Sequence, residues 1–298
     1  MKPLVTPKKK WPYVVVIAIC LFYITPLLMT GLYAFSESWG KTVLPDKLTI
    51  HWFVVLFKDP YFLQAVLRSF MLSIGMLVVI LALMIPSVFL LFLYFPKLDK
   101  AVQSLTMMPY AIPGVILVTA LLKTYSKSAI PMLVVLGGAL FISCLPVMYM
   151  SIRNSLIAVN TKELMEAGAM LGAHPFSIIV KVILPNLRIG IVLSSLMVFS
   201  GLFGEYVLTN LLVGGRFETL RIYMLRRMNE NGHLASSVIV IYFIVLMLVG
   251  LGINYLSHKQ KSKSSISTNK MKLNNKKRKQ SVKESPLIPF SDQLKEGI

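Results

Sequence analysis

The one carboxylate that lies inside a long hydrophobic stretch is that of Glu205, in the segment SGLFGEYVLTN. An ionisable group at the centre of a membrane costs roughly 2.5–3.5 kcal/mol on insertion scales, so it normally faces a helix bundle or an aqueous path. Small or polar residues recur seven, four and four positions apart along this stretch: Ser194, Gly201, Glu205 and Thr209. This spacing places them on one stripe of an α-helix and predicts a candidate substrate path.

Two roles for Glu205 follow from its chemistry, and the sequence leaves both open. Its carboxylate could line the path and meet a cationic or amine-bearing substrate, or act in gating. It could instead pair with an arginine or with a helix end and stabilise the packing of the bundle.

No other set of residues predicts catalysis or metal binding. Gly40-Lys41-Thr42 resembles the end of a phosphate-binding loop, but Phe35 stands where that loop needs a glycine. The four histidines, His51, His174, His233 and His258, lack metal-ligand spacing. A membrane enzyme using Glu205 as an acid or base would need His or Asp partners in neighbouring spans, and none is visible. We therefore expect no catalytic residue, no metal site and no cofactor in this chain.

The composition is that of a polytopic membrane protein. Hydrophobic residues make up 56% of the 298 residues and charged residues only 14%, where a soluble domain has about a quarter. The formal net charge is +19, but the positive residues gather near the two ends of the chain. Beside hydrophobic segments, such clusters favour anionic lipid headgroups over nucleic acid.

Six hydrophobic stretches approach the ~20 residues that cross a bilayer, so the predicted fold is all-α with six membrane spans. They cover residues 13–35, 69–95, 105–122, 131–150, 189–212 and 237–256. The third contains Pro109 and Pro113, which predict a kinked helix packed inside the bundle.

The positions of lysine and arginine predict that both termini are cytosolic, because cytosolic loops are enriched in these residues. Residues 1–12 then form a basic N-terminus and 13–256 the six-span domain. Residues 257–298 form a basic, disordered tail near anionic lipid.

A short polar segment, residues 151–188, separates the fourth and fifth stretches on the cytosolic side. Asn160 and Glu163 have the form of a capping box, which predicts a helix from Thr161 to Leu171. Gly172 then supplies a left-handed C-cap, and Pro175 suits the first turn of a second helix. That helix reaches toward Leu184 and is expected to break at Pro185.

The spacing within this segment resembles the EAA motif of inner-membrane permeases of binding-protein-dependent ABC importers. Glu166-Ala167-Gly168 is followed after three residues by Gly172, and after nine more by Val182-Ile183-Leu184-Pro185. Gly168 replaces the second alanine of the pattern and Val182 its isoleucine. Upstream, LFKDPYFLQAVLRS resembles the segment that leads into the permease core, with Arg68 where asparagine is more usual.

The resemblance implies a type I ABC importer permease fold in the bacterial plasma (inner) membrane. It implies that the segment is a coupling helix seated on a cytosolic ATPase subunit. The coupling residues would be Glu166, Ala167, Gly168, Gly172, Leu184 and Pro185. The implied partners are a second, related permease, two ATPase subunits that bind ATP and Mg, and an extracytoplasmic solute-binding protein.

Phe203-Gly204-Glu205-Tyr206, followed by Gly214-Gly215, resembles the spermidine/putrescine branch of these permeases. This implies transport of a polyamine or a related small amine-bearing solute. Aminoethylphosphonate and ferric iron are alternative substrates within the family. An ATP-independent channel or secondary transporter is an alternative of another class, although the inverted repeats expected of a secondary transporter are not visible.

Overall fold

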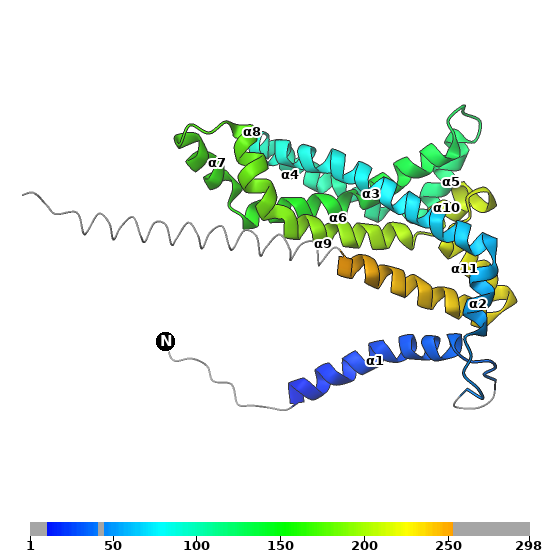
Figure 1. The fold of residues 1–298 in the computed structure, drawn as a ribbon. Coiled ribbons are helices and arrows are strands. Elements are labelled where there is room, and N and C mark those ends of the chain that lie inside the picture. Colours follow the sequence, from blue (N-terminus) through cyan, green and yellow to red (C-terminus); the bar gives the residue numbers. More distant parts are fainter. Residues whose placement is uncertain (1–10, 41–44, 253–298) are drawn as a thin grey trace, which may run out of the picture. The chain divides into compact units, whose positions relative to one another are not determined.

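A computed structural model describes residues 11–40 and 45–252 of the chain. The elements are helices, apart from one isolated bridge between Ser36 and Leu48. In the described ranges the first helices are α1 (Trp11–Ala34), α2 (His51–Lys58), α3 (Pro60–Tyr94), α4 (Pro96–Thr106), η1 (Met108–Ala111) and α5 (Gly114–Tyr125). They continue with α6 (Met132–Ala158), α7 (Thr161–Met170), α8 (Pro175–Ile178), η2 (Ile179–Ile183), α9 (Leu184–Phe203), α10 (Val207–Leu212), η3 (Gly214–Phe217) and α11 (Leu220–Glu230). A last helix covers Gly232–Gly252 (Figure 1).

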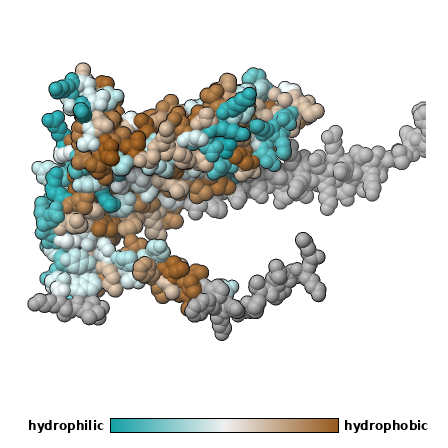
Figure 2. Space-filling model, turned by 180° about the vertical axis from the view of Figure 1, so that it is seen from behind, coloured by the Kyte–Doolittle hydropathy of each residue, from teal (hydrophilic) through white to brown (hydrophobic). Residues whose placement is uncertain are grey.

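Within the described residues, five helices are long and apolar enough to cross a membrane, and six if a bent pair counts as one span. The five are Tyr13–Ala34, Pro60–Tyr94, Met132–Ala158, Pro175–Phe203 and Gly232–Gly252. Figure 2 shows hydrophobic side chains along the body of these helices and hydrophilic ones gathered at the ends. The prediction of an all-α membrane protein is confirmed.

The third hydrophobic stretch, 105–122, is not one span. The chain bends by 92° between Pro96–Ala111 and Gly114–Tyr125. Pro113 stands just before Gly114 with φ −58° and ψ 133°, an extended conformation that cannot continue a helix. The kink expected here is therefore a complete break, and the described segment is either a broken span or a re-entrant loop.

The core lies where α3, α6 and α9 pack together. Its largest fully buried side chains include Tyr149 on α6 and Phe199 on α9. α6 and α9 approach so closely that a β-carbon placed on Gly190 would collide with the hydroxyl of Ser155. Glycine at this position therefore sets the distance between the two helices.

A buried ion pair joins α4 to α6. Arg153 Nε donates to Asp99 Oδ2 at 2.9 Å, and the Asp99 side chain is only 4% exposed. The Tyr149 hydroxyl also donates to the Asp99 carboxylate. Because a buried charge is costly without partners, these contacts fix the start of the bent pair against α6.

α1 is joined to the rest of its unit by its C-terminal end. The ring of His233 lies between those of Tyr33 and Trp52, with centroid distances of 4.0 Å and 5.4 Å. Ala34 is fully buried at the same place, whereas the side chains from Tyr13 to Leu28 are exposed. Those exposed side chains are hydrophobic, as expected of a helix surrounded by lipid or by other helices.

Residues 1–250 form one unit and 251–298 a second, and each is considered by itself. The basic N-terminus of residues 1–12 lies almost wholly outside the described residues, and the basic tail of residues 257–298 lies wholly outside them.

Candidate functional site

The turn between α6 and α7 does not use the capping box expected there. Asn160 adopts a left-handed conformation, with φ 50° and ψ 49°, and its side chain makes no capping hydrogen bond. Instead the hydroxyl of Thr161 donates to the carbonyl of Leu156 at 2.7 Å. Asparagine tolerates left-handed geometry better than most residues, so here it supplies a backbone bend rather than a cap. The helix itself begins at Thr161, as expected.

The turn between α7 and α8 is a Schellman motif centred on Gly172. Gly172 has φ +73°. Its N–H donates to the carbonyl of Ala169 at 2.9 Å, and the N–H of Ala173 donates to that of Gly168 at 3.0 Å. This pair of hydrogen bonds closes the carbonyl end of a helix, and the positive φ favours glycine. The predicted left-handed C-cap is confirmed.

α8 begins at Pro175, in the first turn as expected. His174 precedes it in an extended conformation, and its Nδ1 accepts the N–H of Phe176 at 3.3 Å. Proline at the first helical position costs nothing, because its missing N–H would have no partner within the helix. The segment is therefore helix, glycine turn, helix, at the end of the unit marked by α7 and α8 in Figure 1.

Pro185 does not break the second helix, and that expectation is wrong. η2 is a π-helical turn through which α8 continues into α9, so Pro175–Phe203 is one 29-residue helix. In a regular α-helix the ring of Pro185 would collide with the carbonyl four residues earlier. The wider π turn before it relieves that collision. The side-chain amide of Asn186 donates to the carbonyl of Val182 at 2.9 Å.

Close packing inside the segment involves Gly168. A β-carbon placed there would lie 2.5 Å from Cδ1 of Ile178 on α8. Ile178 is 4% exposed, so its side chain fills the space that glycine leaves open. Gly168 thus draws α7 and α8 together, which the sequence resemblance did not indicate.

Three large apolar side chains are exposed at the tip of the segment. Two of them precede the candidate span that begins at Pro175, and the third lies in its first turn. Met170 is 90% exposed, Leu171 86% and Phe176 68%. Glu166 and Ala167 are also exposed, and within the described residues the Glu166 carboxylate has no hydrogen-bond or ion-pair partner. Sequence reasoning passed over Met170, Leu171 and Phe176. The sequence feature that could have indicated this surface is three bulky apolar residues on the two sides of a glycine turn, in an otherwise polar segment.

Leu184 and Pro185 lie apart from this tip. They stand at the first turn of α9, with Leu184 half-buried and Pro185 exposed. The structure therefore brings Glu166, Ala167, Gly168 and Gly172 together in and after α7, and places the other two motif residues at the base of the segment.

Glu205 does not lie within a helix. α9 ends at Phe203 and α10 starts at Val207, so the continuous fifth span expected over 189–212 is interrupted. The carboxylate of Glu205 accepts the N–H of Leu208 at 2.7 Å and that of Thr209 at 2.9 Å. It also accepts the hydroxyl of Thr209. Glu205 thus caps the N-terminus of α10, where a negative charge is favourable.

The predicted stripe is broken for the same reason. Ser194 and Thr209 are buried, at 1% and 0% exposure, whereas Gly201 is exposed. Helical spacing cannot align residues across a non-helical break at 204–206, so these four positions do not share one face. Gly204 makes room at the break, because a β-carbon there would lie 2.5 Å from the hydroxyl of Tyr242.

Residues 65–263 match the family described as the binding-protein-dependent transport system inner membrane component. The chain belongs to this family. It is accordingly a permease, a membrane component of a binding-protein-dependent ABC importer, and a transport component rather than an enzyme.

Solved structures share the permease fold at low sequence identity. A bacterial ABC transporter involved in the import of the acidic polysaccharide alginate has a chain with 16% identity and a TM-score of 0.65, covering 85% of this chain and 96% of that one. The same transporter type in complex with an alginate pentasaccharide-bound periplasmic protein gives 15% identity, a TM-score of 0.65 and the same coverage. A methionine ABC transporter in inward-facing conformations gives 19% identity and a TM-score of 0.56, covering 66% of this chain and 94% of that one.

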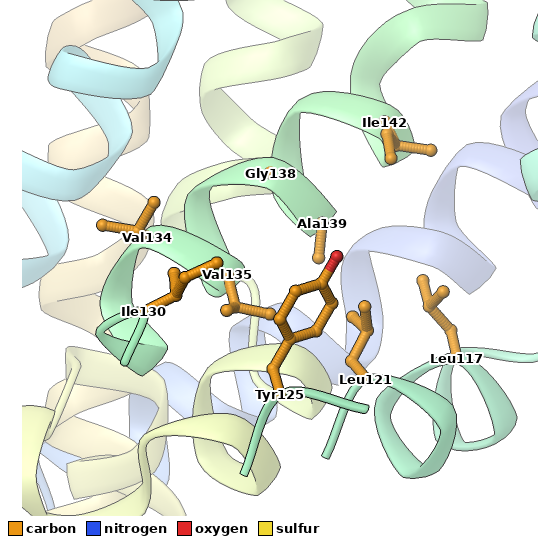
Figure 3. Close-up of a pocket in the computed structure, with 9 residues that line it drawn as sticks. All are labelled: Leu117, Leu121, Tyr125, Ile130, Val134, Val135, Gly138, Ala139 and Ile142. Atoms are coloured by element: carbon orange, nitrogen blue, oxygen red, sulfur yellow. The ribbon is translucent and has the colours of Figure 1, made fainter. Parts of the chain in front are cut away.

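The permease also has an apolar cavity of about 270 Å³ between α5 and α6. Figure 3 shows Tyr125 pointing its ring into this space, where Leu121 and Ala139 face it from the two helices. The other lining residues are aliphatic or glycine, so the cavity has no charged group to hold a polar solute.

Proposed function

We propose that this permease forms half of the translocation path of an ATP-driven uptake system, and that residues 161–178 seat it on a cytosolic ATPase subunit. The exposed trio of Met170, Leu171 and Phe176 carries the proposal. Bulky apolar side chains at the end of a helix pair are unfavourable in water and are typical of a protein interface.

The backbone of the segment supports the same role. The Schellman turn at Gly172 and the packing of Ile178 on Gly168 make α7 and α8 one rigid unit. Because α8 continues into α9 without a loop, a displacement of the tip is carried into a membrane span. The exposed carboxylate of Glu166, which has no partner among the described residues, is available to accept hydrogen bonds from the ATPase.

The proposed assembly has a second permease, related but different, two ATPase subunits and an extracytoplasmic solute-binding protein. ATP and Mg bind to the ATPase subunits and not to this chain. Both termini lie in the cytosol of a bacterial cell, with the basic ends near anionic lipid. The lysine and arginine distribution supports this orientation.

The test is ATPase activity of the reconstituted complex with and without loaded binding protein. Glu166→Lys reverses the charge of the exposed carboxylate, and Leu171→Ser removes one apolar anchor. Gly172→Pro removes the left-handed turn, because proline cannot adopt positive φ. We expect each variant to insert normally and to lose most of the stimulation by loaded binding protein.

Ala173→Ser is the matched control, since Ala173 is exposed beside the same turn and serine adds only a hydroxyl. It should keep full stimulation. Undiminished stimulation in Glu166→Lys, Leu171→Ser and Gly172→Pro would remove the coupling assignment.

For the substrate we propose a polyamine or a related small amine-bearing solute. The support is the resemblance of Phe203-Gly204-Glu205-Tyr206 and Gly214-Gly215 to the polyamine branch. Glu205 supports an amine substrate less than its sequence position suggested, because both of its carboxylate oxygens accept hydrogen bonds from α10. Thermal-shift screening of the cognate binding protein with amines, phosphonates and ferric ion tests the proposal. Stabilisation by a phosphonate or by ferric ion, and not by amines, would replace it.

A further inference from the structure

A polar cavity of about 410 Å³ lies between the start of α3 and the segment from η3 to α11. Its charged lining residues are Arg68, Arg216, Arg226, Arg227, Glu218 and Glu230. It lies at the end of the unit opposite to α7 and α8 in Figure 1, on the side predicted to be extracytoplasmic. Nothing in the coupling role uses these residues.

The walls of this arginine pocket are fixed by contacts between α3 and α11. The N–H of Leu220, at the start of α11, donates to the buried hydroxyl of Ser69 at 2.7 Å. One turn further, the hydroxyl of Tyr223 donates to Asp59 Oδ2 at 2.7 Å. Arg227 donates to the same oxygen at 2.7 Å. These contacts hold α11 against the start of α3, and these two helices supply most of the pocket lining.

Two of the four arginines are neutralised by neighbouring acids. Arg226 Nη1 lies 3.2 Å from the Glu218 carboxylate. Arg227 pairs with Asp59 and with Glu230. Each of the two acids that line the pocket thus has an arginine partner, although Glu218 Oε1 accepts no hydrogen bond within the described residues.

The other two arginines are not neutralised. The Arg68 guanidinium donates to Gln64 Oε1 at 3.4 Å and lies 5.9 Å from the centre of the Phe217 ring. Arg216 lies in η3, two residues after Gly214, which has φ +59°, and its side chain is exposed. Within the described residues neither arginine has an acidic partner within 4.0 Å.

We infer that the arginine pocket is a binding site for an oxyanion, a carboxylate or a phosphate-type group. A guanidinium presents N–H groups in a planar fork that matches such groups in two places at once. Arg68 and Arg216, neither of which has an acidic partner among the described residues, would attract an oxyanion into this cavity and repel a protonated amine, so the pocket is separate from the path proposed for an amine substrate. The oxyanion could belong to a free solute at the mouth of the permease or to an acidic side chain of the binding protein.

The first arm of the test measures binding of inorganic phosphate to the purified complex with its partner subunits, by calorimetry at constant ionic strength. Arg68→Gln and Arg216→Gln should each weaken binding roughly tenfold, as expected for a lost hydrogen bond to a charged group. Lys127→Gln is the matched control, because Lys127 is exposed and does not line the pocket, so this substitution removes one positive charge elsewhere. It should leave binding unchanged.

The second arm measures the affinity of the unloaded binding protein for the same complexes. A loss confined to phosphate binding identifies a free solute as the source of the oxyanion. A loss of binding-protein affinity, diminished at high salt, identifies an acidic side chain. If neither affinity falls by more than in Lys127→Gln, the inference is overturned. Neither arm needs ATP turnover, so failure here is distinct from failure of the coupling role.

Assembly is checked by size-exclusion chromatography for each variant. Arg216 is exposed, so Arg216→Gln should assemble even if Arg68→Gln does not, and it then carries the test alone. Arg68→Lys keeps the charge but loses the fork, and should bind with intermediate affinity.

Discussion

Gly168 and Ile178 are in such close contact that the smallest side chain on Gly168 would lie 2.5 Å from Cδ1 of Ile178. Glycine at position 168 therefore leaves the space that the buried Ile178 side chain fills. α7 and α8 pack as closely as they do because of this pair.

Gly168→Ala should destabilise the permease by about 1 kcal/mol. The crowding typically costs ~1–3 kcal/mol, and the better helix propensity of alanine offsets up to ~1 kcal/mol of it. In an Ile178→Ala background the same change should be neutral or stabilising, because the crowding atoms are gone. The thermal midpoint of the four proteins of this cycle is the measurement. An equal effect of Gly168→Ala in both backgrounds would show that the contact is not what restricts the position.

Asp99→Asn should be among the most destabilising single changes. It leaves the guanidinium of Arg153, whose side chain is only 18% exposed, without its carboxylate. Breaking a buried pair from one side costs ~3–5 kcal/mol, whereas replacing both partners by apolar groups is often neutral. Assembled protein should therefore fall sharply in Asp99→Asn and recover in the double variant Asp99→Leu, Arg153→Met. Fluorescence-detected size exclusion measures both, and a double variant worse than Asp99→Asn would contradict the account.

Glu205→Gln should lower membrane abundance and uptake in parallel. The Leu208 and Thr209 N–H groups donate to different oxygens of the carboxylate. A carboxamide replaces one of these oxygens with an NH2 donor, which would face an N–H group instead of accepting from it. A buried donor left without a partner costs ~1–3 kcal/mol. Immunoblotting and substrate uptake are measured in one strain, with Thr209→Val as the milder control that removes only the hydroxyl bond. Full abundance with abolished uptake would instead favour a carboxylate that lines the path.

Asp59→Asn should destabilise the permease at neutral pH and make little difference in acid. Burial alone would raise the pKa of Asp59, but hydrogen bonds from Tyr223, Tyr61 and Arg227 outweigh it and hold the pKa below the usual 3.8. The stabilisation is therefore complete above that value and is lost as the pH falls through the lower pKa of the folded state. Burial raises the pKa of the Tyr223 hydroxyl to about 12, so this donor stays protonated at neutral pH.

Thermal midpoints of wild type and Asp59→Asn between pH 7 and pH 3 test this dependence. The two curves should converge toward the acid end of this range. A constant gap would mean that the carboxylate charge does not contribute.

The sequence predicted the elements that depend on local chemistry. Hydrophobic length located a long helix at five of the six predicted spans, but the fifth, expected over 189–212, covers Pro175–Phe203. The positive φ of Gly172 followed from glycine at the end of a helix. The residues that were wrongly assigned depend on tertiary contacts. Pro185 reads as a helix breaker unless the π turn before it is known, and Glu205 reads as a helical residue unless the break at Gly204 is known. The arginine pocket was hidden because its residues lie about 150 positions apart in the chain.

The π turn of η2 has a geometric consequence for the whole helix from Pro175 to Phe203. A π turn holds one residue more than an α turn, which shifts the angular phase of everything after it by about 100°. The extra residue of the π turn thus sets the orientation of the α8 face that packs on α7 relative to the α9 face that packs on α6. Deleting one residue within Ile179–Ile183 would shorten this helix of ~42 Å by only ~1.5 Å. It would, however, rotate the α8 face that packs on α7 by about 100° relative to the α9 face that packs on α6.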